Sequence, residues 1–552
     1  MEKLILGIIS VSLLSTVINL NAGFEPSNWP DQFSNGAFST KPYGTVSDDI
    51  KGTIKDYPNA INAICNYSEG QADWVVNGAT DELKIKFPAS AFVTLNFAYM
   101  QKDVVPVIIF YTTNWSESTP KMIRDFEQDN MAKHFANLII DCQLIGYMHS
   151  KFPEKPIASM IINPDFLAEL QKNLYFLANQ KALTDNNTWT ATDANDFVKN
   201  ALGTELKVTK ALQKAVYFCE KSKLPWKTKS LTPIFIVEDM CSTVIGNEGT
   251  IPDWDSKSTT GFKDQFEALM KSSWASIKDS DYQSQAIPAE ITNDFTGYIQ
   301  AVNYLVKEKT KFDANGAYAG KESATFGWSG NNWAVSYGKN LQGAQWIHTN
   351  ADFAKIKTYA AQMYDTWNNL KVYSGNWAGD FIAFDKYERN SFALINGEDY
   401  FARGWLWNQE EWLDYLEFIK YSTVALNKPA LLFQIPGGHL GSDVTDRSKM
   451  STEPQFFFGD SEFSIPTSVA DLKLSGEYKT RASETVSAFL TKNWSNEHIT
   501  DAVNSNIFAI IWGGGTTTSI GNYPATYADG GWLADKIDES PMKHLLPTAL
   551  SK

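Results

Sequence analysis

The feature that most constrains the fold is a series of short apolar runs, each ending in polar or aromatic residues. The clearest lies within residues 429–439, where a proline precedes Ala430–Ile435 and Pro436-Gly437-Gly438 follows it. A continuous apolar run of this length is expected of a parallel strand covered on both faces, and proline and glycine mark its limits. We therefore expect a buried strand whose tip carries Gln434 and His439.

Seven segments of the chain share this pattern, and helical periodicity fills the intervals between them. Residues 408–419, for example, combine a capping-box pair, Asn408 and Glu411, with apolar residues at helical spacing. Strands that alternate with helices, without an internal repeat of fixed period, favour a barrel of parallel strands over a solenoid. The expected strands are 105–111, 156–162, 232–237, 324–328, 379–385, 429–435 and 507–512.

The expected fold is therefore α/β, a (β/α)8 TIM-type barrel, regular or distorted, whose eighth strand the sequence does not mark. Residues 23–90 are rich in Gly, Pro, Asn and Asp, so we expect an irregular N-terminal extension there, followed by a barrel domain with insertions over 91–552. A doubly wound open sheet is the alternative. It lacks support because Gly513-Gly514-Gly515 has neither the spacing nor the lysine of a phosphate-binding loop.

The first 22 residues have the pattern of a secretory signal peptide. Lys3 precedes an apolar run from Leu4 to Ile18 that is too short to span a bilayer, and Ala22 supplies a small residue for cleavage. No later segment is long and apolar enough to be a membrane span. We therefore expect a mature protein that is secreted or periplasmic. The chain has four cysteines, whose pairing stays open: Cys65, Cys142, Cys219 and Cys241.

Charge and aromatic content narrow the class of partner. The net charge of -15 and the pI near 5.0 argue against nucleic acid or an anionic membrane surface, because both would be repelled on average. Many of the 18 Trp, 23 Tyr and 33 Phe lie in polar or glycine-rich stretches, where flat rings suit the faces of sugars. The same rings can equally be the filling of a large barrel. A neutral ligand is the expectation.

Acidic and aromatic residues follow the expected strands, and in a barrel these strand ends meet on one face. Glycosidic cleavage needs one acid to protonate the leaving oxygen and a second carboxylate to attack the sugar or activate water, separated by about 5.5 Å for retention or about 6.5–9.5 Å for inversion. The candidate catalytic residues are Asp385 and Glu388 as the leading pair, with Asp165 and Glu238 in reserve. The expected substrate contacts are Trp328, Trp333, Gln434, His439 and Trp512.

Each candidate acid also has a purely structural interpretation. Asp165 can cap the helix that follows it. Glu238 is adjacent to Asp239, so on a strand at most one of the two faces the barrel axis. Asp385 and Glu388 can form a solvated charge cluster at the end of their strand. These alternatives stay open at the level of the sequence.

Other chemistries lack their sequence signatures. The chain has no His-Glu-x-x-His spacing for zinc, and its six histidines are scattered. It has no Gly-x-Ser-x-Gly nucleophile elbow and no cysteine in a protease-like context. We therefore expect no metal and no cofactor, which leaves hydrolysis through carboxylates.

Four strand ends carry short motifs: Ile161-Ile162-Asn163-Pro164-Asp165, Asp385-Lys-Tyr-Glu388-Arg389, Gln434-Ile-Pro-Gly-Gly-His439 and the glycine-rich end at Trp512. Together they resemble a poorly characterised group of secreted bacterial glycoside-hydrolase-like (β/α) barrel proteins, over roughly residue 105 to the C-terminus. The resemblance implies a barrel and a sugar substrate, not a named activity. Members often carry Glu-Pro-Asp where this chain has Asn163, which puts catalysis from that strand in doubt.

The function expected from these observations is that of a secreted carbohydrate-active protein. We expect a glycoside hydrolase that cleaves a polysaccharide or oligosaccharide by a two-carboxylate acid/base mechanism. The alternative is a non-catalytic sugar-binding barrel involved in host or surface interaction, which Asn163 favours, and a third interpretation is a structural envelope protein. The sugar, the linkage, the stereochemical outcome and the oligomeric state are not determined by the sequence.

Overall fold

A closed barrel of eight parallel strands organises the molecule. The computed structural model describes residues 24–39, 48–68, 83–101, 103–113, 124–164, 166–167, 170, 191–221, 262–313, 315–331, 353–386, 394–395, 398–399, 407, 409–437, 452–461, 494–513, 531–539 and 546–551. The strands, in their order around the barrel, are β1 (Ser34–Phe38), β10 (Ile507–Trp512), β9 (Ala430–Ile435), β6 (Phe381–Asp385), β5 (Thr325–Asn331), β4 (Ser159–Ile162), β3 (Val105–Phe110) and β2 (Ala63–Tyr67). The expected TIM-type barrel is confirmed.

Six of the seven strands expected from apolar runs are barrel strands, namely β3, β4, β5, β6, β9 and β10. The remaining one, 232–237, lies outside the described residues. In the barrel β4 pairs directly with β5, with Ser159 opposite Thr325. Six of the expected runs therefore correspond to strands, and β3, β4, β6, β9 and β10 are buried along their whole length.

Two barrel strands, β1 and β2, lie within residues 23–90, the segment expected to be an irregular extension. The barrel begins at Ser34, so the expected boundary at residue 91 needs correction. The two strands have the sequences SNGAF and AICNY, whose small and polar residues interrupt any apolar run. Small residues are required there, because a Cβ on Gly36 would lie 2.3 Å from Ile511 Cδ1 and 3.0 Å from the Cβ of Ala63.

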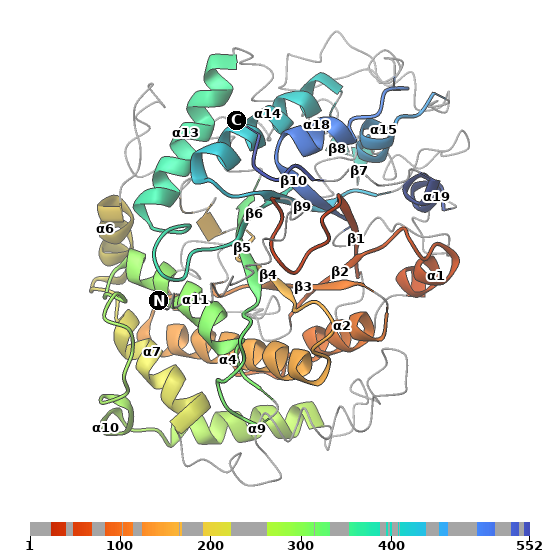
Figure 1. Ribbon diagram of the computed structural model, residues 1–552. Coiled ribbons are helices and arrows are strands. Elements are labelled where there is room, and N and C mark those ends of the chain that lie inside the picture. Colours follow the sequence, from red (N-terminus) through yellow and green to blue (C-terminus); the bar gives the residue numbers. More distant parts are fainter. Residues whose placement is uncertain are drawn as a thin grey trace, which may run out of the picture.

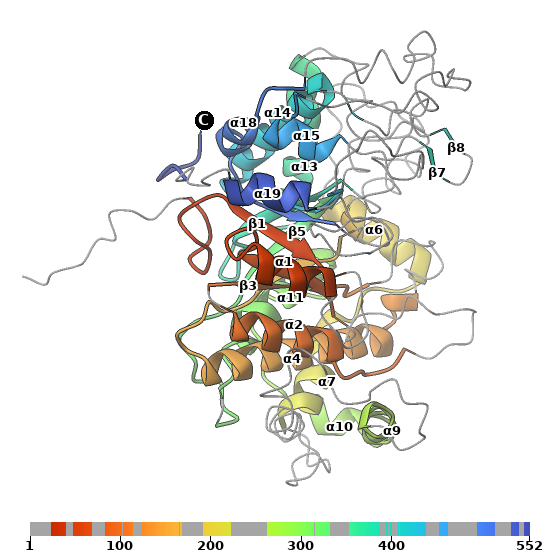
Figure 2. The same ribbon diagram turned by 90° about the vertical axis from the view of Figure 1, so that its right-hand side faces the viewer.

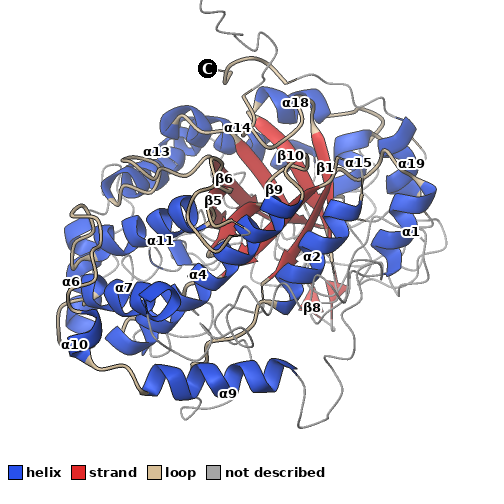
Figure 3. Ribbon diagram, turned by 60° about the horizontal axis from the view of Figure 1, so that its bottom comes forward, coloured by secondary structure: helices blue, strands red, loops and turns tan. Residues whose placement is uncertain are grey.

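Helices surround the barrel, as Figures 1 and 3 show. In Figure 1, α13 and α14 lie above the strands, and α2 and α4 lie below them. The described helices are α1 (Asp48–Asp56), α2 (Ala89–Met100), α4 (Gln128–Lys151), α6 (Ala191–Leu202), α7 (Val208–Val216), the π-helix η1 (Tyr217–Lys221), α9 (Phe262–Ala275), α10 (Asp279–Tyr282), α11 (Phe295–Lys309), α13 (Phe353–Asn369), α14 (Gln409–Leu426), α15 (Glu453–Phe458), α18 (Ile499–Asn504) and α19 (Trp532–Glu539).

A short antiparallel pair, β7 (Leu394–Ile395) and β8 (Glu398–Asp399), follows β6 in the chain and stands apart from the barrel in Figure 2. None of the described helices combines the length and the apolar character that crossing a membrane would need. Cys65, Cys142 and Cys219 are free thiols, and Cys241 lies outside the described residues.

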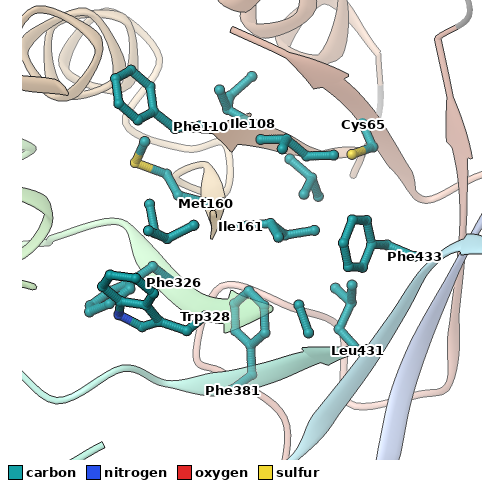
Figure 4. Close-up of a cluster of buried hydrophobic side chains, with 14 of the residues drawn as sticks. Cys65, Ile108, Phe110, Met160, Ile161, Phe326, Trp328, Phe381, Leu431 and Phe433 are labelled. Carbon is teal, nitrogen blue, oxygen red and sulfur yellow. The ribbon is translucent and has the colours of Figure 1, made fainter. Parts of the chain in front are cut away.

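The barrel interior is filled by apolar side chains. Strand register places Ile161 beside Gly327, Gly327 beside Phe381, and Ala383 beside Leu431 on the inner face. Figure 4 shows Ile161, Phe381 and Leu431 turned toward this interior. A Cβ on Gly327 would lie 2.5 Å from Cδ2 of Phe381, so the large ring is accommodated because its neighbour is glycine. The barrel is therefore a packed core, and a ligand could enter only at its ends.

Candidate active site

The carboxyl end of β6 brings an acidic side chain to the mouth of the barrel. Asp385 is the last residue of β6 and is opposite Phe433 in the register, on the inner face that Ala383 and Leu431 share. Its side chain is buried, with the residue 2% exposed. Tyr415 of α14 donates a hydrogen bond from Oη to the backbone carbonyl of Asp385 at 3.1 Å, which ties this strand end to the helical layer. The leading catalytic candidate therefore has a defined position on a rigid element.

The neighbouring strand end carries an amide in an uncommon backbone conformation. Gln434 has a φ of 53° and is buried, and Nε2 donates to Oη of Tyr67 at 2.5 Å. The bond crosses from β9 to β2, which are not neighbours in the barrel. Along β9 the register shifts, because the pairs Ile510–Leu432 and Trp512–Ile435 enclose one residue of β10 and two of β9. Such a bulge re-aims a side chain, and left-handed non-glycine residues are concentrated at functional sites.

Aromatic rings from the first three strands line the same mouth. Tyr67 ends β2, stacks on Tyr111 with ring centroids 6.1 Å apart, and meets Phe38 edge to face at 5.1 Å. Tyr67 is half-buried, whereas Phe38 and Tyr111 are buried. None of these three rings was expected from the sequence as a ligand contact, where the available signal was an aromatic residue at or just after the end of each strand.

Asn163 directly follows Ile162, the last residue of β4. Its backbone is left-handed with φ 47°, which asparagine tolerates well. Oδ1 accepts from the backbone N–H of Thr112 at 2.5 Å, and Nδ2 donates to Oγ1 of Thr112 at 2.6 Å. Oγ1 of Thr112 also hydrogen-bonds Oη of Tyr298 on α11. An amide both accepts and donates here, which an ionised carboxylate cannot do, so Asn163 joins the ends of β3 and β4.

Two hydroxyl groups near the mouth are buried and have no hydrogen-bond partner in the described part of the chain. Oγ of Ser329 lies on the inner face of β5, opposite Ala383 and therefore one inward-facing position below Asp385. Oγ1 of Thr113 lies just beyond the end of β3. Buried polar atoms are nearly always paired in folded proteins, so exceptions are places where a ligand or an ordered water is expected.

A second group of charges lies on the outer side of β6, behind Asp385. Lys386 is fully buried, and its Nζ lies 4.2 Å from the centre of the Trp407 ring. Burial lowers the pKa of Lys386 to about 7, although the charges of Glu453, Glu411 and, more weakly, Asp385 favour the protonated form. Glu411 and Glu453 are themselves buried. This charge cluster, Lys386 with Glu411 and Glu453, connects the end of β6 to α14 and α15.

Trp328 and Trp512, two of the expected substrate contacts, are fully buried in the outer packing of the barrel. Nε1 of Trp328 donates to Oδ1 of Asn303 on α11 at 2.8 Å. Nε1 of Trp512 donates to Oδ1 of Asn35 at 2.8 Å. Trp328 lies between the inward-facing Gly327 and Ser329, so strand alternation turns it toward the helices. The geometry offers no ligand surface on either ring.

The structure therefore brings Asp385 and Gln434 together at the barrel mouth. Five other candidate residues lie outside the described residues: Asp165, Glu238, Trp333, Glu388 and His439. Over the part of the chain that is described, no three His, Cys, Asp or Glu side chains are grouped as a metal site would require. The described residues at the barrel mouth thus offer a buried carboxyl group, neutral amide and hydroxyl groups, and the faces of aromatic rings.

Comparison with known proteins adds little to this description. No family model matches the chain, and no curated protein matches it. A solved structure similar to it is the catalytic domain of beta-amylase from Paenibacillus polymyxa, with 11% identity, 74% of this chain and 88% of that chain covered, and a TM-score of 0.27. The assignment of the fold therefore rests on the strand order and register of this chain itself.

Proposed function

We propose that the protein is a glycoside hydrolase that binds a neutral carbohydrate at the carboxyl end of its barrel and uses Asp385 as one of its two reacting carboxyl groups. One observation carries the proposal. A buried carboxyl group lies on the inner face of a closed barrel, at the end lined by the Gln434–Tyr67 hydrogen bond and the rings of Phe38 and Tyr111. In barrels of this type the chemistry takes place at this end.

The residues at the mouth have distinct roles in this proposal. The rings stack on the apolar faces of sugar units, and the amide of Gln434 with the hydroxyl of Tyr67 exchanges hydrogen bonds with sugar hydroxyls. Asp385 supplies one carboxyl group for proton transfer or for attack on the anomeric carbon. Glu388 is the first candidate for the second carboxyl group, because it follows three positions later in the chain, and Asp165 and Glu238 are the reserves.

The test is release of reducing sugar from a panel of β-glucans, chitin and α-glucans, by the parent protein and by Asp385→Asn. Loss of a reacting carboxyl group lowers the rate about 10²–10⁴-fold. Asp380→Asn is the matched control, because Asp380 lies just before the opposite end of the same strand and bonds Lys307 at 2.6 Å. Glu388→Gln, assayed in parallel, examines the second carboxyl group. Parent-level release by Asp385→Asn would remove Asp385 from the reaction.

The second candidate function is a barrel that binds sugar without cleaving it. It is favoured by the amides at two strand ends, Asn163 and Gln434, which provide hydrogen bonds but cannot transfer a proton as a carboxyl group does. No release from any polymer, together with calorimetric binding of an oligosaccharide that Tyr67→Ala weakens, would establish this function instead.

A further inference from the structure

A cavity of about 560 Å³ lies in the outer helical layer, formed by α9, α4, α7 and the segment 83–85. Figure 3 shows α9 along the lower edge of the molecule, below α4 and α7. The cavity is unrelated to the barrel mouth, since none of its lining residues belongs to a barrel strand. Its volume falls within the range of small-molecule sites.

The net charge of the residues that line this cavity has the opposite sign to the net charge of the whole protein. They are Lys84, Lys133, Lys214 and Lys271, against Asp129 and Glu267, so four positive and two negative side chains leave a formal charge of +2. The whole chain has a net charge of -15. A local reversal of this kind concentrates small anions where the rest of the surface repels them.

Asp129 shows how the cavity holds a carboxylate. Oδ1 accepts from Nζ of Lys214 at 2.6 Å and from Nε1 of Trp274 at 3.0 Å, and Oδ2 lies 3.3 Å from Nζ of Lys133. Burial by itself would raise the pKa of Asp129, but the hydrogen bond and charge of Lys214 and the charge of Lys133 outweigh it and lower the pKa. Lys133 and Lys214 therefore lie against an ionised carboxylate near neutral pH.

The two lysines nearest to Asp129 are held in place by packing, which reduces the entropy lost when an anion binds. The side chains of Lys133 and Lys214 are only 9% and 13% exposed. Nζ of Lys214 also lies 4.4 Å from the centre of the Trp274 ring, a cation–π contact. Apolar side chains, among them Leu83, Ile85 and Met270, complete the lining. A ligand would thus meet positive charge on one side and apolar surface on the other.

We propose that this cavity is a second ligand site, which binds a small organic anion whose carboxylate or phosphate group faces the lysines while an apolar face packs against the floor formed by Leu83, Ile85 and Met270. An acidic sugar, such as a hexuronate or a sugar phosphate, has both features and fits the volume. The site is separate from the proposed hydrolytic site and does not rest on it. The lysines act by binding, without a chemical step.

The test measures binding of glucuronate, glucose 6-phosphate and, as the neutral reference, glucose by isothermal calorimetry. The variant is Lys84→Glu/Lys271→Glu, which changes the formal charge of the lining from +2 to -2 at two exposed positions and so spares the packed core. The matched control is Lys210→Gln, which removes a lysine one turn before Lys214 on α7 that bonds Asp279 outside the cavity.

The expected result is that at least one of the two anions binds the parent, that the double variant binds it at least 10-fold more weakly, and that Lys210→Gln binds it like the parent. Binding should also weaken as salt is raised. Comparison of the two anions separates carboxylate from phosphate recognition. Absence of binding of both anions to the parent, or equal binding by the double variant, would overturn the proposal. Sugar release at the barrel mouth is measured separately, so either proposal can fail without the other.

Discussion

The two ends of the barrel are built on different principles. The amino end is closed by a ring of neutral hydrogen bonds: Asn28 and Trp29 donate to Oγ of Ser159 at 3.0 and 2.8 Å, Ser159 shares a 2.7 Å bond with Thr325, and Thr325 donates to Oδ1 of Asn28 at 2.8 Å. At the carboxyl end, Asp385 and the Lys386 charge cluster are buried, Asn163 and Gln434 have left-handed backbones, and the hydroxyl of Ser329 has no partner among the described residues.

The difference between the two ends indicates that residues at the amino end mainly stabilise the fold, whereas residues at the carboxyl end form the proposed site. A ring of satisfied neutral groups costs little to bury and fixes the strands, so the amino end stabilises the barrel. Buried charges and strained residues cost free energy in the folded state, and such features are found where a site needs pre-positioned groups. The same eight strands therefore carry a stabilising amino end and a carboxyl end at which we propose that the ligand binds.

The largest effect that this comparison predicts is at the amino end. Trp29→Ala removes a buried ring that packs edge to face on Phe508 at 5.1 Å, and we expect the free energy of unfolding to fall by about 3–5 kcal/mol. The measurement is denaturant unfolding. Sugar release or sugar binding per folded molecule should stay at the parent level. A change in ligand affinity with unaltered stability would contradict the division between the two ends.

The next effect is a pH dependence from Lys386. Its pKa is about 7 in the folded protein and about 10.4 when unfolded, so between these values the unfolded chain binds more protons. This residue therefore makes the free energy of unfolding rise with pH from about 7 to about 10, and its burial is most costly below pH 7. We expect the free energy of unfolding of the parent, relative to that of Lys386→Met, to rise by a few kcal/mol between about pH 7 and about pH 10.

The control for this effect is Lys357→Met, which removes an exposed lysine on α13. Its unfolding profile against pH should run parallel to that of the parent. Parallel profiles for Lys386→Met as well would show that Lys386 does not titrate in this window, and the interpretation of the charge cluster would then be wrong.

A smaller effect compares two serines on the inner face of the barrel. Ser159→Ala removes the acceptor of the indole N–H of Trp29, whereas Nδ2 of Asn28 still donates to the backbone carbonyl of Ile157 at 2.7 Å. Because a buried donor is left unpaired, we expect a loss of about 1–3 kcal/mol in the free energy of unfolding. Ser329→Ala removes a buried hydroxyl that has no partner among the described residues, and should be neutral or stabilising. If Ser159→Ala and Ser329→Ala lowered the free energy of unfolding equally, the hydrogen bonds of the two ends would not differ in their contribution to stability.

The smallest effect concerns the hydrogen bond between Gln434 and Tyr67. Gln434→Leu removes the amide that holds Tyr67 and that we propose bonds a sugar hydroxyl. A neutral hydrogen bond contributes about 0.5–1.5 kcal/mol, so loss of the bond to the sugar should lower carbohydrate affinity roughly 3- to 10-fold. Titration calorimetry with an oligosaccharide measures this change. Gln32→Leu, at the amino end, is the control and should bind like the parent. Unchanged affinity in Gln434→Leu would place the ligand away from this pair.

The sequence predicted most of the barrel because a parallel strand buried on both faces must be apolar along its whole length. β6, β9 and β10 were recognised from such runs. β1 and β2 were not, because the close approach of Gly36 to Ile511 and Ala63 requires small residues, which also occur in loops. A strand that depends on tight packing has no local signature.

The candidate site was predicted in part. Asp385 and Gln434 were expected at the barrel mouth because they end apolar runs, and both lie there. Trp328 and Trp512 were expected as ligand contacts but are buried, because strand alternation turns both side chains away from the barrel axis. The amide at Asn163 could be read from the sequence as a missing acid, whereas its bonds to Thr112 give it a structural role.

The sequence by itself determined the alternation of buried strands and helices and the residues at the ends of six strands, whereas β1 and β2, which complete the closed barrel, were found only in the tertiary structure. The alternation and the six strand ends follow from local patterns, since burial on both faces dictates composition over five or six consecutive residues. Only the tertiary structure decided which side chains face the axis, how Gln434 reaches Tyr67 across the barrel, and that lysines from α4, α7 and α9 line one cavity. Those contacts join residues far apart in the chain, so no local sequence pattern predicts them.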